Sequence, residues 1–167
     1  ANPVNRCFHC KKNLYRTLRD ILGQLDSSSV LLSGTKLDDL DDFRPGLEAA
    51  KEAAVRHPFV EASITKAQLR EIARKSALPF ADLPAAPCLA SRLYTGTEVQ
   101  ADLLQLIDQT EEWIREQTGL AVVRCRVHQK KMRVEVENPS LVENQPKFVL
   151  DLRARVLKVS DLINSVV

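Results

Sequence analysis

The chain has 167 residues, of which 44% are hydrophobic and 28% charged, with a formal net charge of +2 at pH 7. These values are ordinary for a globular protein with a buried core, and so small a charge does not point to nucleic acid or an acidic partner. No apolar run approaches the roughly 20 residues of a membrane helix, and no signal-peptide pattern opens the chain. Four cysteines do not make a disulfide scaffold. We therefore expect a cytoplasmic, reducing setting in which cysteines serve catalysis or metal binding.

A polar, basic segment covers residues 2–12. The spacing Cys7-x-x-Cys10 suits half of a zinc site or a redox pair at the start of a helix. A structural zinc site usually needs a second close pair, which Cys88 and Cys125 do not make, and His9 is typical of a surface residue. The basic residues of the segment suit either a phosphate contact or a solvated face: Arg6, Lys11 and Lys12.

Hydrophobic periodicity predicts the elements of the first half. We expect a helix over 11–25, a break at 26–29 and a short buried parallel strand over 30–32. Pro45 suits the first turn of an alanine-rich helix to Arg56, and a second short strand is predicted over 59–62. Thr65-x-x-Gln68 is a capping box for a helix through Lys75. This alternation predicts part of a doubly wound α/β layer. The apolar residues expected to face inward at the last helix are Ile64, Leu69 and Ile72.

The segment 34–46 follows the first predicted strand and is rich in aspartate. Loops at the carboxyl ends of parallel strands are where α/β proteins bind ligands. The carboxylates suit Mg²⁺ or a ribose, and Arg44 suits a phosphate. A solvated acidic turn that caps the next helix is the alternative, and both stay open. The four aspartates are Asp38, Asp39, Asp41 and Asp42.

The segment 84–96 carries polar side chains that no helical or strand period explains. Two prolines rigidify the approach to Cys88, and Gly96 permits a sharp exit. A loop with this content is typical of a functional site, whereas a lone cysteine is more often a small buried hydrophobe. The run offers a thiol, a hydroxyl, a guanidinium and a phenol: Cys88, Ser91, Arg92 and Tyr94.

After Gly96 the pattern changes to one long amphipathic helix over 99–118 and a hairpin with strands over 120–128 and 131–137. Period 2 puts Arg124 and Arg126 on one face, where they either clamp an anion or lie exposed on an edge strand. Cys125 falls on the core face. A final helix is predicted over 148–166, and we expect no last strand at the C-terminus.

Three motifs occur in order: Asn2-Pro3-x-x-Arg6-Cys7-x-x-Cys10-Lys11, Gly34-Thr35-x-x-Asp38-Asp39-x-x-Asp42-x-Arg44-Pro45-Gly46 and Pro87-Cys88-Leu89-Ala90-Ser91-Arg92. Together they resemble the LarE-type enzymes, ATP-dependent sacrificial sulfur transferases of the PP-loop ATP-pyrophosphatase superfamily that help build the nickel-pincer cofactor of lactate racemase. The resemblance covers essentially the whole chain. It implies an α/β fold, with residues 1–83 as the remainder of a Rossmann-like (adenine nucleotide alpha hydrolase-like) PP-loop domain. Residues 84–97 are then the catalytic cysteine loop, and 98–167 a small α+β domain for substrate binding and oligomerisation.

The resemblance also implies the chemistry. With ATP and Mg²⁺, such enzymes adenylylate a carboxylate of a pyridinium mononucleotide. Cys88 matches the cysteine that displaces AMP to form a thioester and then gives up its sulfur. One cysteine in this loop favours the sacrificial mechanism over an iron–sulfur cluster, and a homo-oligomer is implied. Substrate and phosphate contacts are implied for Ser91, Arg92, Arg124, Arg126 and Glu112 or its neighbour Glu111, and a signature loop for Asp38, Asp39, Asp42 and Arg44.

The sequence departs from the family pattern in three ways. The Ser-Gly-Gly-x-Asp-Ser loop that cradles pyrophosphate is not present, and the chain opens on Ala1. We therefore expect a fragment that does not hydrolyse ATP by itself. Lys36 also replaces the asparagine usual in the signature loop. Two alternatives stay open: a PP-loop amide ligase of the NAD or asparagine synthase type, in which Cys88 is incidental, and a non-enzymatic metal-binding module centred on Cys7 and Cys10.

Overall fold

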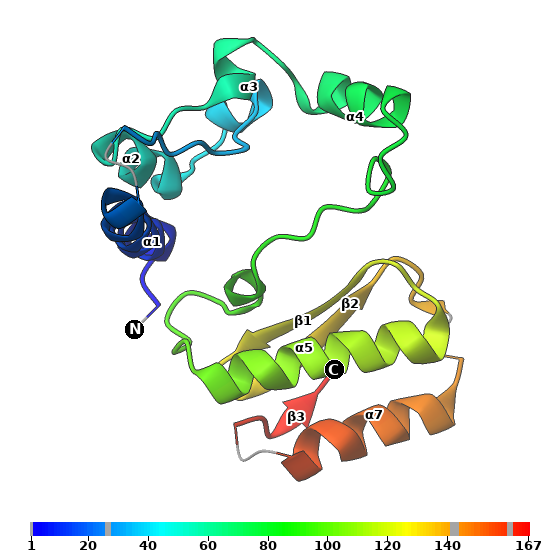
Figure 1. Cartoon of the computed structure of the whole chain (residues 1–167). Helices are drawn as coiled ribbons and strands as arrows, with labels where there is room; N and C mark the ends of the chain where they lie inside the picture. Colours follow the sequence, from blue (N-terminus) through cyan, green and yellow to red (C-terminus); the bar gives the residue numbers. More distant parts are fainter. Residues whose placement is uncertain (1, 26–27, 141–143, 160–161) are drawn as a thin grey trace. The chain divides into compact units, whose positions relative to one another are not determined.

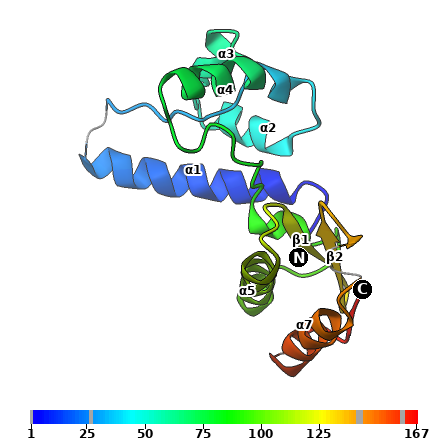
Figure 2. The ribbon, with the colours of Figure 1, turned by 90° about the vertical axis from the view of Figure 1, so that its right-hand side faces the viewer.

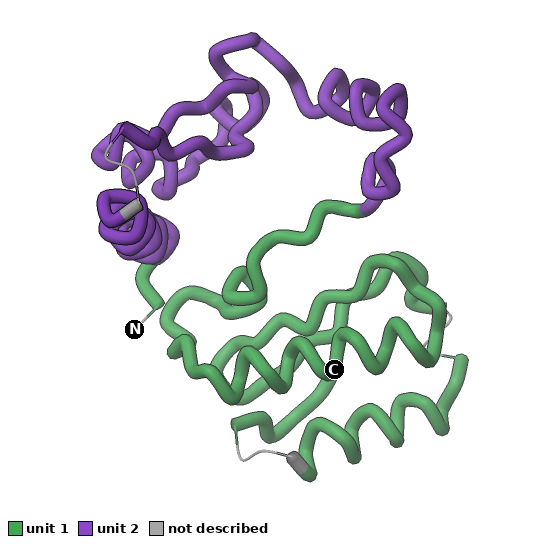
Figure 3. The backbone as a smooth tube through the Cα atoms, in the orientation of Figure 1, with its two compact units in different colours: residues 1–3, 84–167 green, residues 4–83 purple. Residues whose placement is uncertain are grey.

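A computed structural model describes residues 2–25, 28–140, 144–159 and 162–167. The chain divides into two compact units (Figure 3). Unit 1 contains residues 1–3 and 84–167, and unit 2 contains residues 4–83. Each unit has its own hydrophobic core. Among the described residues, no helix is both long and apolar enough to cross a membrane.

Unit 2 consists of helices and connecting segments. Its elements are α1 (Arg6–Leu25), the 3₁₀ helix η1 (Leu37–Leu40), α2 (Pro45–Glu52), α3 (Pro58–Glu61) and α4 (Lys66–Lys75). The longest is α1, which Figure 2 shows along its length. Tyr15 of α1 packs against the small side chains Ala49 and Ala50 of α2 and against Val55. Alanine at these positions lets the two helix backbones approach closely.

The predicted α/β layer is not formed by the described residues of unit 2. Residues 30–32 make one isolated parallel bridge, between Leu32 and Arg56, and Val30 and Leu32 are 56% and 61% exposed. The predicted buried strand is therefore wrong, since a parallel strand becomes buried only within a sheet covered on both faces. The strand predicted over 59–62 is also wrong. Pro58 stands at the first position of α3 and presets the helical φ there.

Two helix boundaries of unit 2 also differ from prediction. Helix α1 begins at Arg6 rather than at residue 11, so the Cys7-x-x-Cys10 motif lies at the start of a helix, the position considered for a redox pair. Helix α2 ends at Glu52 rather than at Arg56, because the backbone turns at Ala54, which has a positive φ of 46°. Of the break predicted at 26–29, residues 26–27 lie outside the described residues.

The start of α4 confirms a local sequence signal. Thr65 and Gln68 form the predicted capping box, and the helix ends at Lys75 as expected. Ile64 and Leu69 are half-buried, but Ile72 is 48% exposed. The prediction that Ile72 faces inward is therefore wrong.

Unit 1 is built on a small sheet (Figure 1). In chain order it has the 3₁₀ helix η2 (Leu89–Arg92), α5 (Ala101–Thr118), β1 (Val123–His128), β2 (Lys131–Val136), α7 (Pro146–Val159) and β3 (Ser165–Val166). Strands β1 and β2 form the predicted antiparallel hairpin. Gly119 ends α5 in the left-handed conformation, with φ of 71°. The long helix and the hairpin are thus confirmed.

The core of unit 1 lies between one sheet face and the helices α5 and α7. Cys125, Val127 and Met132 are fully buried on that face, at 0% exposure, and α5 and α7 contribute Ile107 and Val156 to the same cluster. The core position predicted for Cys125 is confirmed. Burial raises the pKa of this thiol, so it stays protonated and unreactive at neutral pH.

The C-terminus differs from prediction. Helix α7 ends at Val159, and residues Ser165–Val166 pair in parallel with Lys131–Met132 as β3. The Val167 N–H also donates to the Met132 carbonyl at 3.0 Å. Both the helix predicted as far as Val166 and the expected lack of a last strand are therefore wrong. On the side away from β1, strand β2 has backbone N–H and C=O groups that need hydrogen-bond partners, and the terminal residues supply them. The same pairing buries Val166, which is 6% exposed.

Candidate active site

Cys88 is presented in a short turn beside β1. Its side chain is exposed, and it occupies the N-cap of η2, where its carbonyl accepts the Ser91 N–H at 2.8 Å. After η2 the chain runs next to β1: Leu93 bridges Val127 in parallel, and the Tyr94 N–H donates to the Val127 carbonyl at 2.9 Å. An accessible thiol in an anchored turn is not the small buried hydrophobe of the alternative interpretation.

Arg92 and Glu111 form a buried ion pair next to this turn. Arg92 Nε and Nη2 donate to the two carboxylate oxygens of Glu111 at 2.8 and 3.0 Å, and the side chains are only 8% and 3% exposed. The hydrogen bond to Glu111 raises the pKa of Arg92. Arg92 Nη1 also donates to the Pro87 carbonyl at 3.2 Å, and Glu111 Oε1 accepts the Cys125 N–H at 2.8 Å. The pair therefore ties the residue before Cys88 to α5 and β1.

Glu111, and not its neighbour Glu112, is the carboxylate at this position. Glu111 is buried and Glu112 is exposed. Consecutive side chains of a helix point about 100° apart, so only one of the two can face β1. The orientation of α5 about its own axis decides which of the two glutamates faces β1. Two adjacent glutamates in a sequence do not reveal that orientation.

Arg124 and Arg126 lie on the sheet face away from the core, as the strand period predicts. Arg126 Nε donates to Glu135 Oε2 at 2.6 Å, and its Nη1 donates to the Ser91 carbonyl at 3.4 Å. Arg124 is half-buried and has no ion-pair or hydrogen-bond partner among the described residues. Ser91 is held on its side-chain oxygen by Arg92 Nη1 at 3.3 Å. The two guanidinium groups thus share a face with one end of the Cys88 turn.

Strand β2 adds charged residues to this face that the sequence analysis did not name. The antiparallel register sets Glu135 opposite Arg124, Arg133 opposite Arg126 and Lys131 opposite His128. The period of 2 along the second predicted strand is the signal that could have found them.

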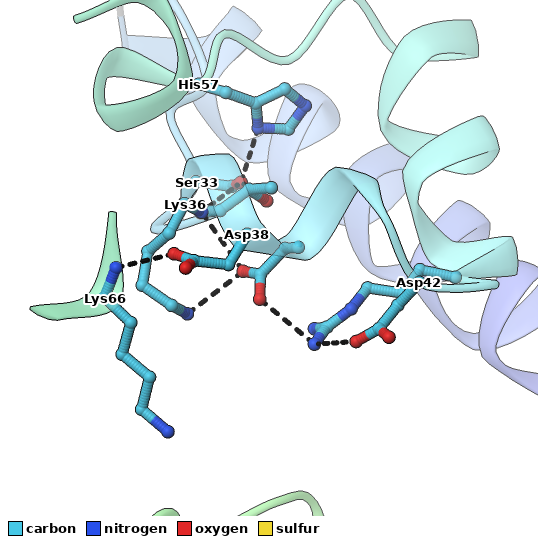
Figure 4. Close-up of polar contacts among 9 residues, drawn as sticks. Ser33, Lys36, Asp38, Asp42, His57 and Lys66 are labelled. Atoms are coloured by element: carbon cyan, nitrogen blue, oxygen red, sulfur yellow. Dashed lines mark hydrogen bonds and ion pairs between the residues drawn. The ribbon is translucent and has the colours of Figure 1, made fainter. Parts of the chain in front are cut away.

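In unit 2, polar contacts hold the signature loop together (Figure 4), and the carboxylate of Asp39 accepts several of them. Its Oδ2 accepts the Lys36 N–H at 3.1 Å and Lys36 Nζ at 3.0 Å, and its Oδ1 pairs with Arg44 Nη2 at 3.0 Å. Burial acts to raise the pKa of Asp39, but the hydrogen bonds from Lys36 and the charges of Lys36 and Arg44 lower that pKa overall. Asp39 is therefore an ionised structural group of this loop.

The other signature-loop residues also make internal contacts. Asp38 Oδ2 accepts the N–H of Lys66, the first residue of α4, at 2.6 Å, and Asp42 pairs with Arg44 at 3.0 Å. Ser33 Oγ lies 2.7 Å from His57 Nδ1. These are the contacts of a helix-capping turn, and no cluster of three or more metal-ligating side chains occurs among the described residues. The carboxylates of Asp38, Asp39 and Asp42 are thus engaged by donors of this chain.

Cys7 and Cys10 are both exposed on α1. Cys7 and Lys11 lie where α1 meets α2: a Cβ added at Gly46 would come within 2.9 Å of Cys7 Sγ and 3.2 Å of Lys11 Cγ. Gly46 thus allows the close approach of the two helices. Arg6, at the start of α1, is half-buried. No group of three or more metal-ligating side chains forms around this cysteine pair among the described residues.

A groove of about 730 Å³ lies between α1 and α2 and is lined by four basic residues of α1. Lys12 Nζ pairs with Glu52 at 2.7 Å, and Arg19 donates to the Ala53 carbonyl at the end of α2. These contacts join the two helices, and a cation at a helix C-terminus is stabilising. The groove therefore has a structural explanation. Its basic residues are His9, Lys12, Arg16 and Arg19.

No family model matches the sequence. Over 136 residues, 81% of this chain, it is 40% identical to an uncharacterized protein of Synechocystis, of which it covers 50%. Over 135 residues it is 30% identical to the pyridinium-3,5-bisthiocarboxylic acid mononucleotide synthase of Lactiplantibacillus plantarum, of which it covers 48%. An uncharacterized protein of Methanocaldococcus jannaschii is 30% identical over 137 residues, with 53% of its length covered.

The chain thus spans about half the length of the curated relatives it matches. The likeness to the synthase supports the LarE-type resemblance of the three motifs. By its name, that relative is a synthase of a pyridinium-3,5-bisthiocarboxylic acid mononucleotide.

Proposed function

We propose that this chain is part of a LarE-type sulfur transferase in which Cys88 is the nucleophile and the sacrificial sulfur donor. The observation that carries the proposal is the exposed Cys88 thiol in a turn anchored beside the arginines of β1. The 30% identity to a bisthiocarboxylic acid mononucleotide synthase supports it. In this proposal residues 84–97 are the cysteine loop, residues 98–167 bind the substrate, and the enzyme is a cytoplasmic homo-oligomer.

The proposed substrate is a pyridinium mononucleotide whose carboxylate arrives activated as an acyl adenylate. The Cys88 thiolate attacks the acyl carbon, a C–S bond forms, and AMP leaves with the electron pair of the broken C–O bond. A base then removes the Cα proton of residue 88 and the Cβ–S bond breaks. The sulfur leaves on the substrate as a thiocarboxylate, and dehydroalanine remains in the protein. Atoms and charges balance without an external oxidant or reductant.

The surrounding residues have separable roles in this proposal. Arg124 and Arg126 bind the substrate phosphate, because guanidinium groups match phosphate oxygens in pairs. Arg92, neutralised by Glu111 and nearly buried, positions the backbone before Cys88 rather than contacting substrate. ATP and Mg²⁺ belong to the proposed activation of the carboxylate, and we assign no residue of this chain to them. For the same reason we propose that these residues alone do not hydrolyse ATP.

The test is the intact mass of the protein, purified with whatever segments flank these residues in the cell, before and after incubation with ATP, Mg²⁺ and a pyridinium dicarboxylic acid mononucleotide. We expect a loss of one H₂S, about 34 Da, that maps to residue 88 as dehydroalanine. The matched control is Cys10→Ala, which removes another exposed thiol and should still lose the same mass.

An unchanged mass with AMP still released would contradict the sacrificial mechanism. That result would favour the amide ligase alternative, in which the activated carboxylate goes to an amine and Cys88 is incidental. Retention of the mass loss in Cys88→Ala would likewise contradict the assignment of the donor.

A further inference from the structure

The sheet of unit 1 has a charged face that α5 and α7 do not cover. These helices pack on the opposite face, where alternate residues of β1 are buried and those of β2 are buried or half-buried. We call the charged side the outer face of the hairpin. Its six residues are Arg124, Arg126, His128, Lys131, Arg133 and Glu135.

The register of the outer face places two like charges opposite each other, because Arg133 faces Arg126 across the hairpin. Lys131 stands opposite His128. Like charges directly opposite in an antiparallel pair are destabilising. Glu135 is the one carboxylate among these six residues, and it does not neutralise all of their positive charge. It pairs with Arg126 at 2.6 Å and not with Arg124, the residue it faces.

Solvation of long cationic side chains reduces this repulsion, so an exposed basic hairpin by itself is not a site. The position of this one distinguishes it. Arg126 donates to the Ser91 carbonyl at the end of the Cys88 turn, and the Tyr94 ring lies 5.4 Å from the His128 ring. Arg126 therefore connects the outer face to the segment that presents the thiol, and Arg133 stands directly opposite Arg126 across the hairpin.

The outer face is also too long for a single phosphate. From Arg124 to His128 is four residues of strand, about 13 Å at 3.3 Å per residue. Arg124 and Arg126 are already assigned to a phosphate in the proposed function. Arg133 and Lys131 are exposed and have no ion-pair partner among the described residues.

We propose that Arg133 and Lys131 form a second anion subsite beside Arg124 and Arg126, which holds a carboxylate of the ligand while the first subsite holds its phosphate. The ligand class is that of the proposed function, a mononucleotide with a carboxylate on its ring. The inference rests on the proposed function for the identity of the site, and it adds the residues that read the second anionic group.

The experiment measures binding, without turnover, of two probes that differ by one anionic group. Nicotinic acid mononucleotide and nicotinamide mononucleotide share the pyridinium ring, ribose and phosphate, but only the first carries a carboxylate. We expect the protein to bind the acid about tenfold more tightly, the scale of one charge-assisted hydrogen bond. In Arg133→Gln this preference should fall toward one, while binding of the amide stays the same. In Arg124→Gln both probes should weaken together, with the preference kept.

Two measurements guard against an effect on folding. Arg133→Gln removes one of two opposed like charges, so its melting temperature without ligand should equal or exceed that of the parent protein. The matched control is Arg153→Gln, an exposed arginine of α7, the helix on the opposite face; it should leave both affinities unchanged.

A carboxylate preference that survives in Arg133→Gln, or the lack of any preference in the parent protein, would overturn the second subsite. Its failure is distinguishable from failure of the proposed function. Mass loss at Cys88 with no carboxylate preference would refute this inference alone, whereas a preference that depends on Arg133 without mass loss would refute only the sulfur-transfer chemistry.

Discussion

The two units differ most in what their cores are made of. Unit 1 closes two helices and a sheet around a large cluster that includes Ile107, Met132 and Val156. The buried cluster of unit 2 is small and partly alanine: Tyr15, Ala49, Ala50 and Val55. Burial of apolar surface supplies most of the favourable free energy of folding, so the core of unit 1 contributes much more stabilisation than the core of unit 2. The candidate cysteine is anchored to this better-packed unit, as a preorganised site requires.

The largest expected effect is a loss of activity in unit 1 without a loss of stability. Cys88→Ala should abolish sulfur transfer and leave the free energy of unfolding within about 0.5 kcal/mol of the parent, because an exposed thiol contributes little packing. An activity assay measures sulfur transfer, and chemical denaturation followed by the fluorescence of Trp113 measures stability. Trp113 is the only tryptophan in the chain, and it stacks on Phe148 in unit 1. Marked unfolding would show instead that Cys88 is a core residue.

The next prediction concerns the buried pair that positions the Cys88 turn. Glu111→Gln should destabilise unit 1 by about 3–5 kcal/mol, because it leaves the buried Arg92 charge unpaired. The same Trp113 signal measures it. The control is Glu112→Gln, on the exposed side of α5, which should change stability by less than about 0.5 kcal/mol. Equal losses of stability from the two substitutions would contradict the orientation of α5 in which Glu111, and not Glu112, faces Arg92.

In unit 2 the matching test is at the contact between α1 and α2. Gly46→Ala should cost about 1 kcal/mol, since the new Cβ would come within 2.9 Å of Cys7 Sγ. Adding Cys7→Ala removes that sulfur. The double variant should then exceed the parent in stability by up to about 1 kcal/mol, from the better helix propensity of alanine.

Amide hydrogen exchange of α1 and α2 reports on unit 2 separately from Trp113. If Gly46→Ala also changed the Trp113 transition, the two units would not unfold independently. If the double variant were no more stable than the single one, the close approach at Cys7 would not explain the glycine.

The smallest expected effect is a pH dependence of unit 2. The pKa of Asp39 is lowered below its ordinary value of 3.8. Such a group contributes stability that is present above its unfolded pKa and is lost as the pH falls through the folded pKa. Asp39→Asn should therefore make unit 2 less stable at neutral pH, and the difference should vanish on acidification. Hydrogen exchange at several pH values would show it, and a difference that persists in acid would contradict the ionised role of Asp39.

How far the sequence was informative depends on how far apart along the chain the contacting residues lie. The hairpin, α5 and the capping box of Thr65 and Gln68 were predicted correctly, because each depends on contacts between residues close together in the chain. The strand over 30–32 was predicted from an apolar run, but a parallel strand needs neighbours from elsewhere in a chain, and the described residues of unit 2 supply only the bridge at Arg56. The β3 pairing was missed for a related reason, since its partner lies more than thirty residues away.

The sequence by itself determined that Arg124 and Arg126 share a face and that Cys125 is buried, because a strand alternates with a period of 2. It also drew attention to Cys88, whose proline-rich segment suits neither a helix nor a strand. Only the tertiary structure decided that Glu111 rather than Glu112 meets Arg92, and that Arg133 stands opposite Arg126. Helix rotation and strand register arise from packing between distant segments, and no local pattern contains that information.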